Sequence, residues 1–152
     1  MTIAHAYGDI LNAREDIIGH QVNCQGVMGS GLAKQIKDKY PAAYIKYKQV
    51  CYKFTPEKML GCCQLVYDKE SDKWIANLFG QLNYGREEQL YTDYSALTAY
   101  LWALKNEAIS RGLSVALPYN LGCGLANGDW NIVHQIIDAV FYDSVVTLYK
   151  LN

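Results

Sequence analysis

The 152-residue sequence lacks any apolar run near the roughly 18 residues that a membrane-spanning helix needs. It also lacks the basic and then apolar N-terminal pattern that marks a secreted protein. Both absences argue against membrane and secreted classes. We therefore expect a cytoplasmic protein with no membrane partner.

A strong net charge is also missing. Fourteen lysines and arginines stand against fifteen aspartates and glutamates, which gives a net charge of −1. General nucleic-acid binders carry a broad positive field, so no general nucleic-acid binding is expected. One local exception is the segment 34–58, where seven lysines accompany only two acidic residues, Asp38 and Glu57. This segment is either a solvated helical face or a surface that attracts a polyanionic substrate.

The sequence contains no pattern of metal ligands and no P-loop. Its five cysteines are odd in number and include no C-x-x-C pair, which suggests neither a disulfide framework nor a zinc site. No metal and no cofactor are expected. Cys123 lies between two glycines and is either a catalytic thiol or a small apolar filler. The string G-x-x-x-x-G-K-[ST] does not occur, which excludes a P-loop NTPase.

The composition and pattern that are present indicate an α/β protein. Hydrophobic residues make up 51% and charged residues 19% of the chain, which supports a packed interior. Short apolar runs that end in glycine alternate with longer stretches of helical periodicity. The length is typical of one domain, so we expect a single domain over residues 1–152.

The alternation predicts where strands and helices lie. Strands are predicted over residues 3–7, 17–23, 62–67, 74–79, 113–117 and 145–148. Helices are predicted over residues 32–40, 42–52, 93–111 and from the capping residue Asp129 to 141. The polar connection 68–73 predicts a hairpin, and residues 80–90 show no period and are predicted to form a loop.

Two glycine-rich segments occupy the same place in this pattern. Loop 1 (residues 26–31) and loop 2 (residues 118–127) each follow a predicted buried strand and precede a predicted helix. Glycines let backbone N–H groups approach an anion, and a helix start adds unsatisfied donors and partial positive charge. In α/β sheets such loops gather at the carboxyl ends of the strands, where two of them can grip one ligand from opposite sides. A diphosphate fits that grip.

Polar residues near the two loops suit the rest of a nucleotide. Asp9 can accept a hydrogen bond from an exocyclic amine such as that of adenine, and Asn23 can bond a ribose hydroxyl. Tyr149, just past the last predicted strand, can stack on a base. The structural alternatives are a turn residue for Asp9 and a strand-terminating amide for Asn23.

Three motifs in this order resemble the macrodomains, which bind ADP-ribose in a cleft between two glycine-rich loops. The motifs are Gly-Asp-Ile at 8–10, Val-Asn-Cys-Gln-Gly-Val-Met-Gly-Ser-Gly-Leu-Ala at 22–33, and Leu-Pro-Tyr-Asn-Leu-Gly-Cys-Gly-Leu at 117–125 followed by Asp-Trp at 129–130. The resemblance spans nearly the whole chain and implies a three-layer α/β/α sandwich with a central mixed sheet. It implies ADP-ribose or an ADP-ribosylated substrate as the partner.

The resemblance also implies binding roles for matching residues. Asp9 resembles the family's adenine-recognising aspartate and Asn23 the asparagine near the distal ribose, while the two loops wrap the diphosphate and distal ribose. Together with Tyr149, the candidate binding residues are Asp9, Ile10, Asn23, Met28, Gly29, Ser30, Gly31, Asn120, Leu121, Gly122, Cys123, Gly124 and Leu125.

The pattern resembles two catalytic branches in different ways. Where the terminal ADP-ribose glycohydrolases have a catalytic lysine and aspartate, this chain has Gln81 and Ala126, which supply neither a lysine adduct nor an acid. The ADP-ribose 1″-phosphate phosphatases share the pattern H-x-x-N-C-x-G-x-x-G-x-G, which makes His20 a catalytic candidate. Asp129 is the second candidate. Strand alternation places His20 and Asn23 on opposite faces of the sheet unless a bulge or the strand end intervenes.

Several interpretations stay open at this point. His20 is alternatively a buried, hydrogen-bonded strand histidine, and Asp129 a helix cap. The leading function is hydrolysis of an ADP-ribose derivative at its distal ribose, either with a terminal phosphate as the leaving group or by cleavage of an ester that links the ribose to a protein. The alternatives are a non-catalytic ADP-ribose reader and a nucleic-acid-associated protein that uses the lysines of 34–58.

Overall fold

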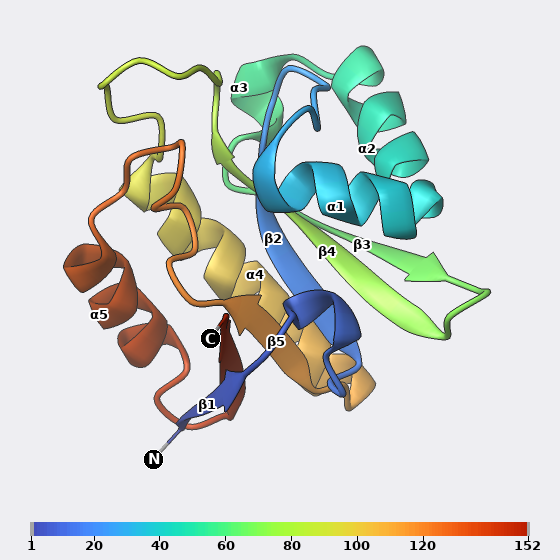
Figure 1. Cartoon of the computed structure of the whole chain (residues 1–152), viewed down its shortest axis with the longest axis vertical. Coiled ribbons are helices and arrows are strands. Elements are labelled where there is room, and N and C mark those ends of the chain that lie inside the picture. The colour runs from blue at the N-terminus through green and yellow to red at the C-terminus, as the bar shows by residue number, and fades with distance from the viewer. Residues whose placement is uncertain (1, 152) are drawn as a thin grey trace.

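The short apolar runs form the strands of one mixed sheet in the computed structural model, which describes residues 2–151 (Figure 1). The strands are β1 (Ile3–Tyr7), β2 (Ile17–Asn23), β3 (Cys63–Asp68), β4 (Lys73–Gln81), β5 (Val115–Pro118) and β6 (Val146–Lys150). Their order across the sheet is β1-β6-β5-β2-β4-β3. All neighbours are parallel except β3 and β4, whose antiparallel pairing confirms the predicted hairpin.

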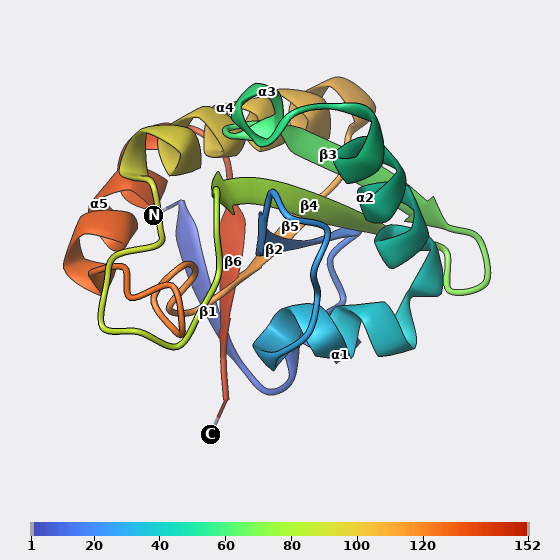
Figure 2. The same cartoon turned by 90° about the horizontal axis from the view of Figure 1, so that it is seen from above.

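Helices cover both faces of this sheet, which confirms the predicted three-layer sandwich. The helices α1 (Gly31–Lys39) and α2 (Pro41–Lys53) lie on one face, while α4 (Tyr94–Arg111) and α5 (Trp130–Val140) lie on the other. Seen from above, α1 and α4 are on opposite sides of the strands (Figure 2). Pro41 stands in the first turn of α2, where its missing N–H costs no helical bond.

Two short elements were not predicted, and some boundaries differ. The 3-10 turn η1 (Ile10–Asn12) and the single-turn helix α3 (Pro56–Met59) are too short to give a periodic signal. Strand β6 continues to Lys150 because β1 pairs with it along the whole length. The prediction that Tyr149 lies just past the last strand is therefore wrong, since Tyr149 pairs with Ala6 inside it.

The helix ends follow the capping residues that the sequence indicates. The Asp93 side chain accepts a hydrogen bond from the Ala96 amide, and Gly112 ends α4 in the left-handed region at φ 68°. The Asp129 side chain likewise accepts from the Asn131 amide at the start of α5. The two aspartates fix where α4 and α5 begin, and Gly112 fixes where α4 ends.

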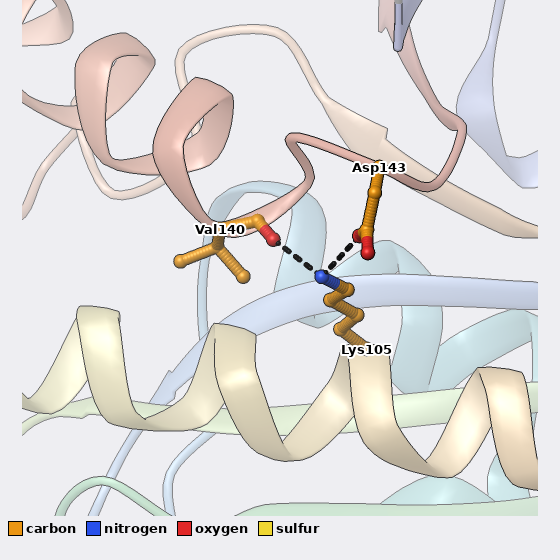
Figure 3. A network of polar contacts seen from close by, with 3 residues as sticks. All are labelled: Lys105, Val140 and Asp143. Atoms are coloured by element: carbon orange, nitrogen blue, oxygen red, sulfur yellow. Dashed lines mark hydrogen bonds and ion pairs between the residues drawn. The ribbon is translucent and has the colours of Figure 1, made fainter.

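A buried lysine ties α4 to α5. Lys105 Nζ donates to the carbonyl oxygen of Val140 at 3.0 Å and pairs with Asp143 Oδ1 (Figure 3). The ring centroids of Trp102 and Tyr142 lie 4.9 and 4.4 Å from the same nitrogen. The lysine therefore satisfies the last carbonyl of α5 with a cation, which the negative end of the helix dipole favours.

The described part of the chain has three features that bear on its class. No helix within residues 2–151 has the length and apolar character to cross a membrane. Across the same residues, no three His, Cys, Asp or Glu side chains come together as metal ligands. All five cysteines are free thiols.

Candidate functional site

A cleft of about 560 Å³ opens at the carboxyl ends of β2, β4 and β5. The loops that follow these three strands gather at one end of the sheet (Figure 1). The lining residues are His20, Gln21, Val22, Asn23, Val27, Gly29, Ser30, Gly31, Leu32, Ala33, Gln81, Tyr84, Gly85, Arg86, Pro118, Tyr119, Asn120, Leu121, Gly122, Gly124, Leu125 and Ala126. Loop 1 and loop 2 thus line the same cleft, as their places in the sequence predict.

Loop 1 presents the start of α1 to the cleft. Gly31 begins the helix at φ 60°, and a Cβ added there would meet no atom within 4 Å. The Ser30 side chain makes no capping hydrogen bond. The first amides of a helix have no intrahelical partner and carry partial positive charge, so this wall of the cleft suits an anion.

Loop 2 is held in a tight conformation by its backbone and by one threonine. Asn120 and Gly122 have φ angles of 67° and 72°, in the left-handed region that favours glycine. Thr92 Oγ1 donates to the Gly122 carbonyl at 2.6 Å, and the Gly128 amide donates to the same oxygen at 2.9 Å. Gly124 borders open space, since an added Cβ would meet nothing within 4 Å.

A polar network under loop 2 was not predicted. Gln21 Nε2 donates to Gln81 Oε1 at 3.0 Å and to Thr92 Oγ1 at 2.9 Å, while the Tyr100 hydroxyl donates to Gln21 Oε1 at 2.9 Å. The network joins β2, β4 and α4 to the Gly122 carbonyl. The sequence signal that could have indicated this network is Gln21, because a polar amide inside an otherwise buried strand needs hydrogen-bond partners.

The lining of the cleft has little charge of its own. Among its described residues, Arg86 alone is charged at neutral pH, and there is no aspartate or glutamate. The absence of carboxylates removes repulsion toward a bound anion. It also leaves the lining without a carboxyl group for acid or base chemistry.

His20 and Asn23 lie on the face of the sheet that α2 covers. The Tyr47 hydroxyl of α2 bonds to Asn23 Oδ1, and Asn77, the partner of His20, donates to the Ala43 carbonyl of α2.

The register of β2 with β4 shifts between Val22 and Asn23 because β4 has one extra residue there, Gly80. Asn23 is the last residue of β2, so the strand end is the exception to alternation that applies here. Asn23 is 8% exposed and donates from Nδ2 to the Val27 carbonyl at 2.8 Å. Its side chain therefore both lines the cleft and braces loop 1.

His20 lies at the floor of the cleft with one ring nitrogen engaged. Its Nε2 is 2.7 Å from Asn77 Oδ1, and its side chain is 1% exposed. Asn77 Nδ2 donates to the Ala43 carbonyl and to Gln64 Oε1, so Oδ1 must accept and His20 Nε2 must carry the hydrogen. His20 Nδ1 is then a buried lone pair, and no described atom hydrogen-bonds to it. Burial lowers the pKa of His20 to about 4, so the ring is neutral at pH 7.

The remaining predicted site residues lie outside this lining. Asp9 is exposed and accepts from the Leu11 amide, Ile10 and Met28 are buried in the core, and Tyr149 donates to Glu15 Oε1 at 2.6 Å. Asp129 caps α5 and is exposed.

Cys123 stands in loop 2 beside the cleft, although it is not among the lining residues. Its Sγ donates to the Leu121 carbonyl at 3.3 Å. Burial raises the pKa of this thiol to about 11, so it carries a proton at neutral pH. A nucleophilic cysteine needs the opposite shift, which favours the interpretation of Cys123 as a filler.

The fold agrees with the comparisons to known proteins. Residues 20–137 match the sequence model of the Macro domain, and this chain belongs to that family. A DNA ADP-ribosyl glycohydrolase of Mycobacterium tuberculosis is 30% identical over 141 residues, which cover 91% of this chain and 38% of that protein. An ADP-ribose 1″-phosphate phosphatase of Scheffersomyces stipitis is 32% identical over 155 residues, which cover 89% of this chain and 88% of the relative.

A solved structure shows the same architecture. The macrodomain of Mycobacterium tuberculosis DarG superposes with a TM-score of 0.83 at 29% identity, over 97% of this chain and 96% of that one. The present chain spans little more than a third of the full mycobacterial relative, at 38% of its length.

Proposed function

We propose that this protein binds ADP-ribose in the cleft and hydrolyses an ADP-ribose derivative at its distal ribose. The observation that carries the proposal is that two loops with left-handed glycines line one cleft without a carboxylate. Such a cleft suits a diphosphate held by backbone amides. The names of two relatives, a DNA ADP-ribosyl glycohydrolase and an ADP-ribose 1″-phosphate phosphatase, support hydrolysis of an ADP-ribose derivative, at a glycosidic bond in the first and at a phosphate ester in the second.

The order of the strands supports one orientation for the ligand. Asp9 follows β1 and Tyr149 lies in β6, at one side of the sheet, whereas His20, Asn23 and Gln81 come from β2 and β4 toward the other side. The adenosine then lies over β1 and β6, where the exposed Asp9 carboxylate can accept from the adenine amine. The distal ribose lies over β2 and β4.

In this orientation His20 is the side chain best placed to act at the distal ribose. Its neutral Nδ1 is buried and has no hydrogen-bond partner among the described residues. In the proposed mechanism this lone pair would accept from a ribose hydroxyl or from the water that attacks the substrate. Hydrolysis adds the hydroxyl of water to the phosphorus or anomeric carbon and its proton to the leaving oxygen. With a pKa of about 4, His20 orients this water more readily than it carries a proton. Asp129 has less support, because its carboxylate caps α5 outside the lining.

The second candidate is an ADP-ribose reader without turnover. Gln81, at the approximate position of the glycohydrolase lysine, is occupied by hydrogen bonds to Gln21 and to the Asn83 carbonyl. Ala126 stands in place of the aspartate. These two positions and the lack of a carboxylate in the lining favour this alternative.

Two measurements test binding and turnover separately. Thermal shifts with ADP-ribose, AMP and NAD test the cleft, because a ligand at about 100 times its Kd stabilises a fold by roughly 2.7 kcal/mol. Release of phosphate from ADP-ribose 1″-phosphate, and of ADP-ribose from modified protein or DNA, tests hydrolysis. If the protein binds ADP-ribose but its turnover stays at background, it is a reader without hydrolase activity. If ADP-ribose causes no thermal shift, both the hydrolase and the reader function are rejected.

The same assays define the role of His20. We expect His20→Leu to lower turnover strongly while ADP-ribose affinity changes little, because the lone pair of Nδ1 disappears and the loops stay. An unfolded variant would also lose turnover, so thermal unfolding of His20→Leu is measured in parallel. His20→Gln is a second variant that keeps a polar side chain at this position. Equal turnover in wild type and a folded His20→Leu would show that His20 is a core residue only.

We also propose a cytoplasmic location. The five cysteines are all free thiols, and Cys62 is exposed. Exposed free thiols persist in reducing compartments, which supports this location. Measured fractionation of the tagged protein from its own cells tests it.

A further inference from the structure

We infer that Asn127 is a positioning residue, which holds the loop between β4 and α4 so that Arg86 contacts the diphosphate of bound ADP-ribose. We call this loop, residues 82–92, loop 3. The inference rests on the proposed function, because it requires ADP-ribose to occupy the cleft. It gives a role to a side chain that does not itself line the cleft.

Loop 3 runs from the start of loop 1 to the end of loop 2 and is bonded to the chain at both ends. Gln25 Nε2, directly before loop 1, donates to the Leu82 carbonyl at 2.9 Å. At the other end, the Ala126 carbonyl of loop 2 accepts from the Tyr91 and Thr92 amides at 2.9 and 3.2 Å. Loop 3 therefore lies beside loop 2 as a third wall of the cleft (Figure 1).

The middle of loop 3 lines the cleft with Tyr84, Gly85 and Arg86. Gly85 packs against the Tyr91 hydroxyl so closely that a Cβ at this position would clash with it. Arg86 is exposed and is the one charged residue of the described lining. It has no carboxylate within 4.0 Å among residues 2–151, so its guanidinium is free to pair with a ligand phosphate.

Asn127 is the side chain of loop 2 that bonds to the middle of loop 3. Its Nδ2 donates to the Glu87 carbonyl at 3.0 Å and to the Gln89 carbonyl at 2.7 Å. Both partners only accept, so both hydrogens of this nitrogen are used and the orientation of the amide follows. Asn127 has a φ of 62°, in the left-handed region that asparagine tolerates better than most residues. One residue thus supplies both a tight backbone turn and two donors to loop 3.

The bond to the Glu87 carbonyl matters because the charge changes sign along loop 3. Arg86 is followed by Glu87 and Glu88, which are exposed and lie outside the lining of the cleft. A displacement of loop 3 by one residue would bring the Glu87 carboxylate toward the diphosphate in place of the guanidinium. The two bonds from Asn127 therefore determine whether this wall attracts or repels an anion.

The experiment measures ADP-ribose binding by isothermal titration, with thermal unfolding in parallel to identify folded variants. Arg86→Gln removes the cation, and Asn127→Gly removes both donors at a backbone conformation that glycine adopts without strain. The variant with both substitutions completes a double-mutant cycle. Asp72→Gly is the matched control, because Asp72 also has a positive φ, 54°, and a hydrogen-bonded side chain but lies in the hairpin before β4.

We expect Asp72→Gly to bind ADP-ribose as wild type does, and Arg86→Gln to bind it about tenfold more weakly, with a difference that shrinks as salt rises. Asn127→Gly should lose about as much, although its Arg86 is intact. The double variant should lose little more than either single variant, because both substitutions remove the same contact. Adding Glu87→Gln to Asn127→Gly should restore part of the affinity, whereas Glu87→Gln alone should bind as wild type does.

Three results would overturn the inference while the proposed function stands. The first is wild-type affinity in Arg86→Gln, and the second is wild-type affinity in Asn127→Gly, since loop 3 then keeps its place without these bonds. The third is a pair of losses that multiply to about a hundredfold in the double variant, which would show that Asn127 acts on loop 2 and not through Arg86. Failure of wild type to bind ADP-ribose would instead reject the proposed function and this inference with it.

Discussion

His20 Nε2 donates to Asn77 Oδ1 at 2.7 Å, and this bond determines which ring nitrogen is left for a ligand. Asn77 comes from β4 and is itself fixed by the Ala43 carbonyl and Gln64. Three elements, β3, β4 and α2, therefore set the tautomer of a residue in β2. The buried neutral ring has consequences for stability as well as for ligand binding.

The first prediction concerns pH. The pKa of His20 is lowered by burial from 6.5 to about 4, so between these values the unfolded chain holds a proton that the folded chain does not. Above about pH 6.5 the His20 ring is neutral in both states, and the stability of the fold is at its full value. As the pH falls toward 4, the unfolded chain takes up a proton at His20 and the free energy of unfolding decreases. The free energy of unfolding should fall by on the order of 1 kcal/mol per pH unit in that window. Urea unfolding from pH 7.5 to 4.5 measures this slope.

Substitutions separate His20 from other titrating groups. His20→Asn should flatten the slope, whereas His5→Asn removes an exposed histidine of β1 and should leave the slope as in wild type. An unchanged slope in His20→Asn would show that His20 takes up its proton at the same pH in the folded and the unfolded chain, so that burial does not keep the ring neutral. The neutral-ring role proposed for it would then be wrong.

The second prediction concerns Gly124 in loop 2. Gly124→Glu should abolish ADP-ribose binding without unfolding the protein, because its side chain enters open space and places a carboxylate where the diphosphate is expected. Isothermal titration and thermal unfolding measure the two properties. Gly124→Ala is the matched control, since its methyl group meets no atom within 4 Å and adds no charge. If Gly124→Glu binds ADP-ribose with wild-type affinity, the diphosphate does not lie beside Gly124 of loop 2.

The third prediction concerns the threonine that holds loop 2. Thr92→Val keeps the shape but leaves Gln21 Nε2 and the Gly122 carbonyl each one hydrogen bond short. We expect a loss of about 1–3 kcal/mol in the free energy of unfolding and a weaker affinity for ADP-ribose, since loop 2 is less well held. Thr98→Val removes a hydroxyl that bonds only to Tyr94 within α4 and serves as control. Unchanged ADP-ribose affinity in Thr92→Val would show that loop 2 keeps its shape without this bond.

The fold could be predicted from the sequence largely because its signals are local. Apolar runs of strand length, the Asp93 and Gly112 caps and the two glycine-rich loops each depend on a few neighbouring residues. The side-by-side position of loop 1 and loop 2 also followed, because parallel strands bring their carboxyl ends to one edge. The family resemblance then supplied the central mixed sheet.

The features of the fold and site that the sequence did not predict depend on contacts between residues far apart in the chain. The side on which Asn23 lies depends on its bond to the Tyr47 hydroxyl of α2, and the register shift beside it depends on the extra residue of β4. The network of Gln21, Gln81 and Thr92 joins three elements, and its members are polar residues with no local pattern. Lys105 belongs to the same group, because a lysine on a helix ordinarily predicts a solvent-facing position.

The last prediction concerns Lys105, which is 4% exposed. Lys105→Met keeps the unbranched apolar stem, one atom shorter, but leaves the Val140 carbonyl without its cation and removes the pairing with Asp143. We expect a loss of about 1–3 kcal/mol in the free energy of unfolding. Asp143→Asn is the matched control, because Asp143 is half exposed and its loss leaves Lys105 bonded to Val140, so its effect should be smaller. ADP-ribose affinity should stay at the wild-type value in both variants, since neither residue lines the cleft. Equal stability of Lys105→Met and wild type would show that the two aromatic rings and the methionine chain hold α5 on α4 by packing alone.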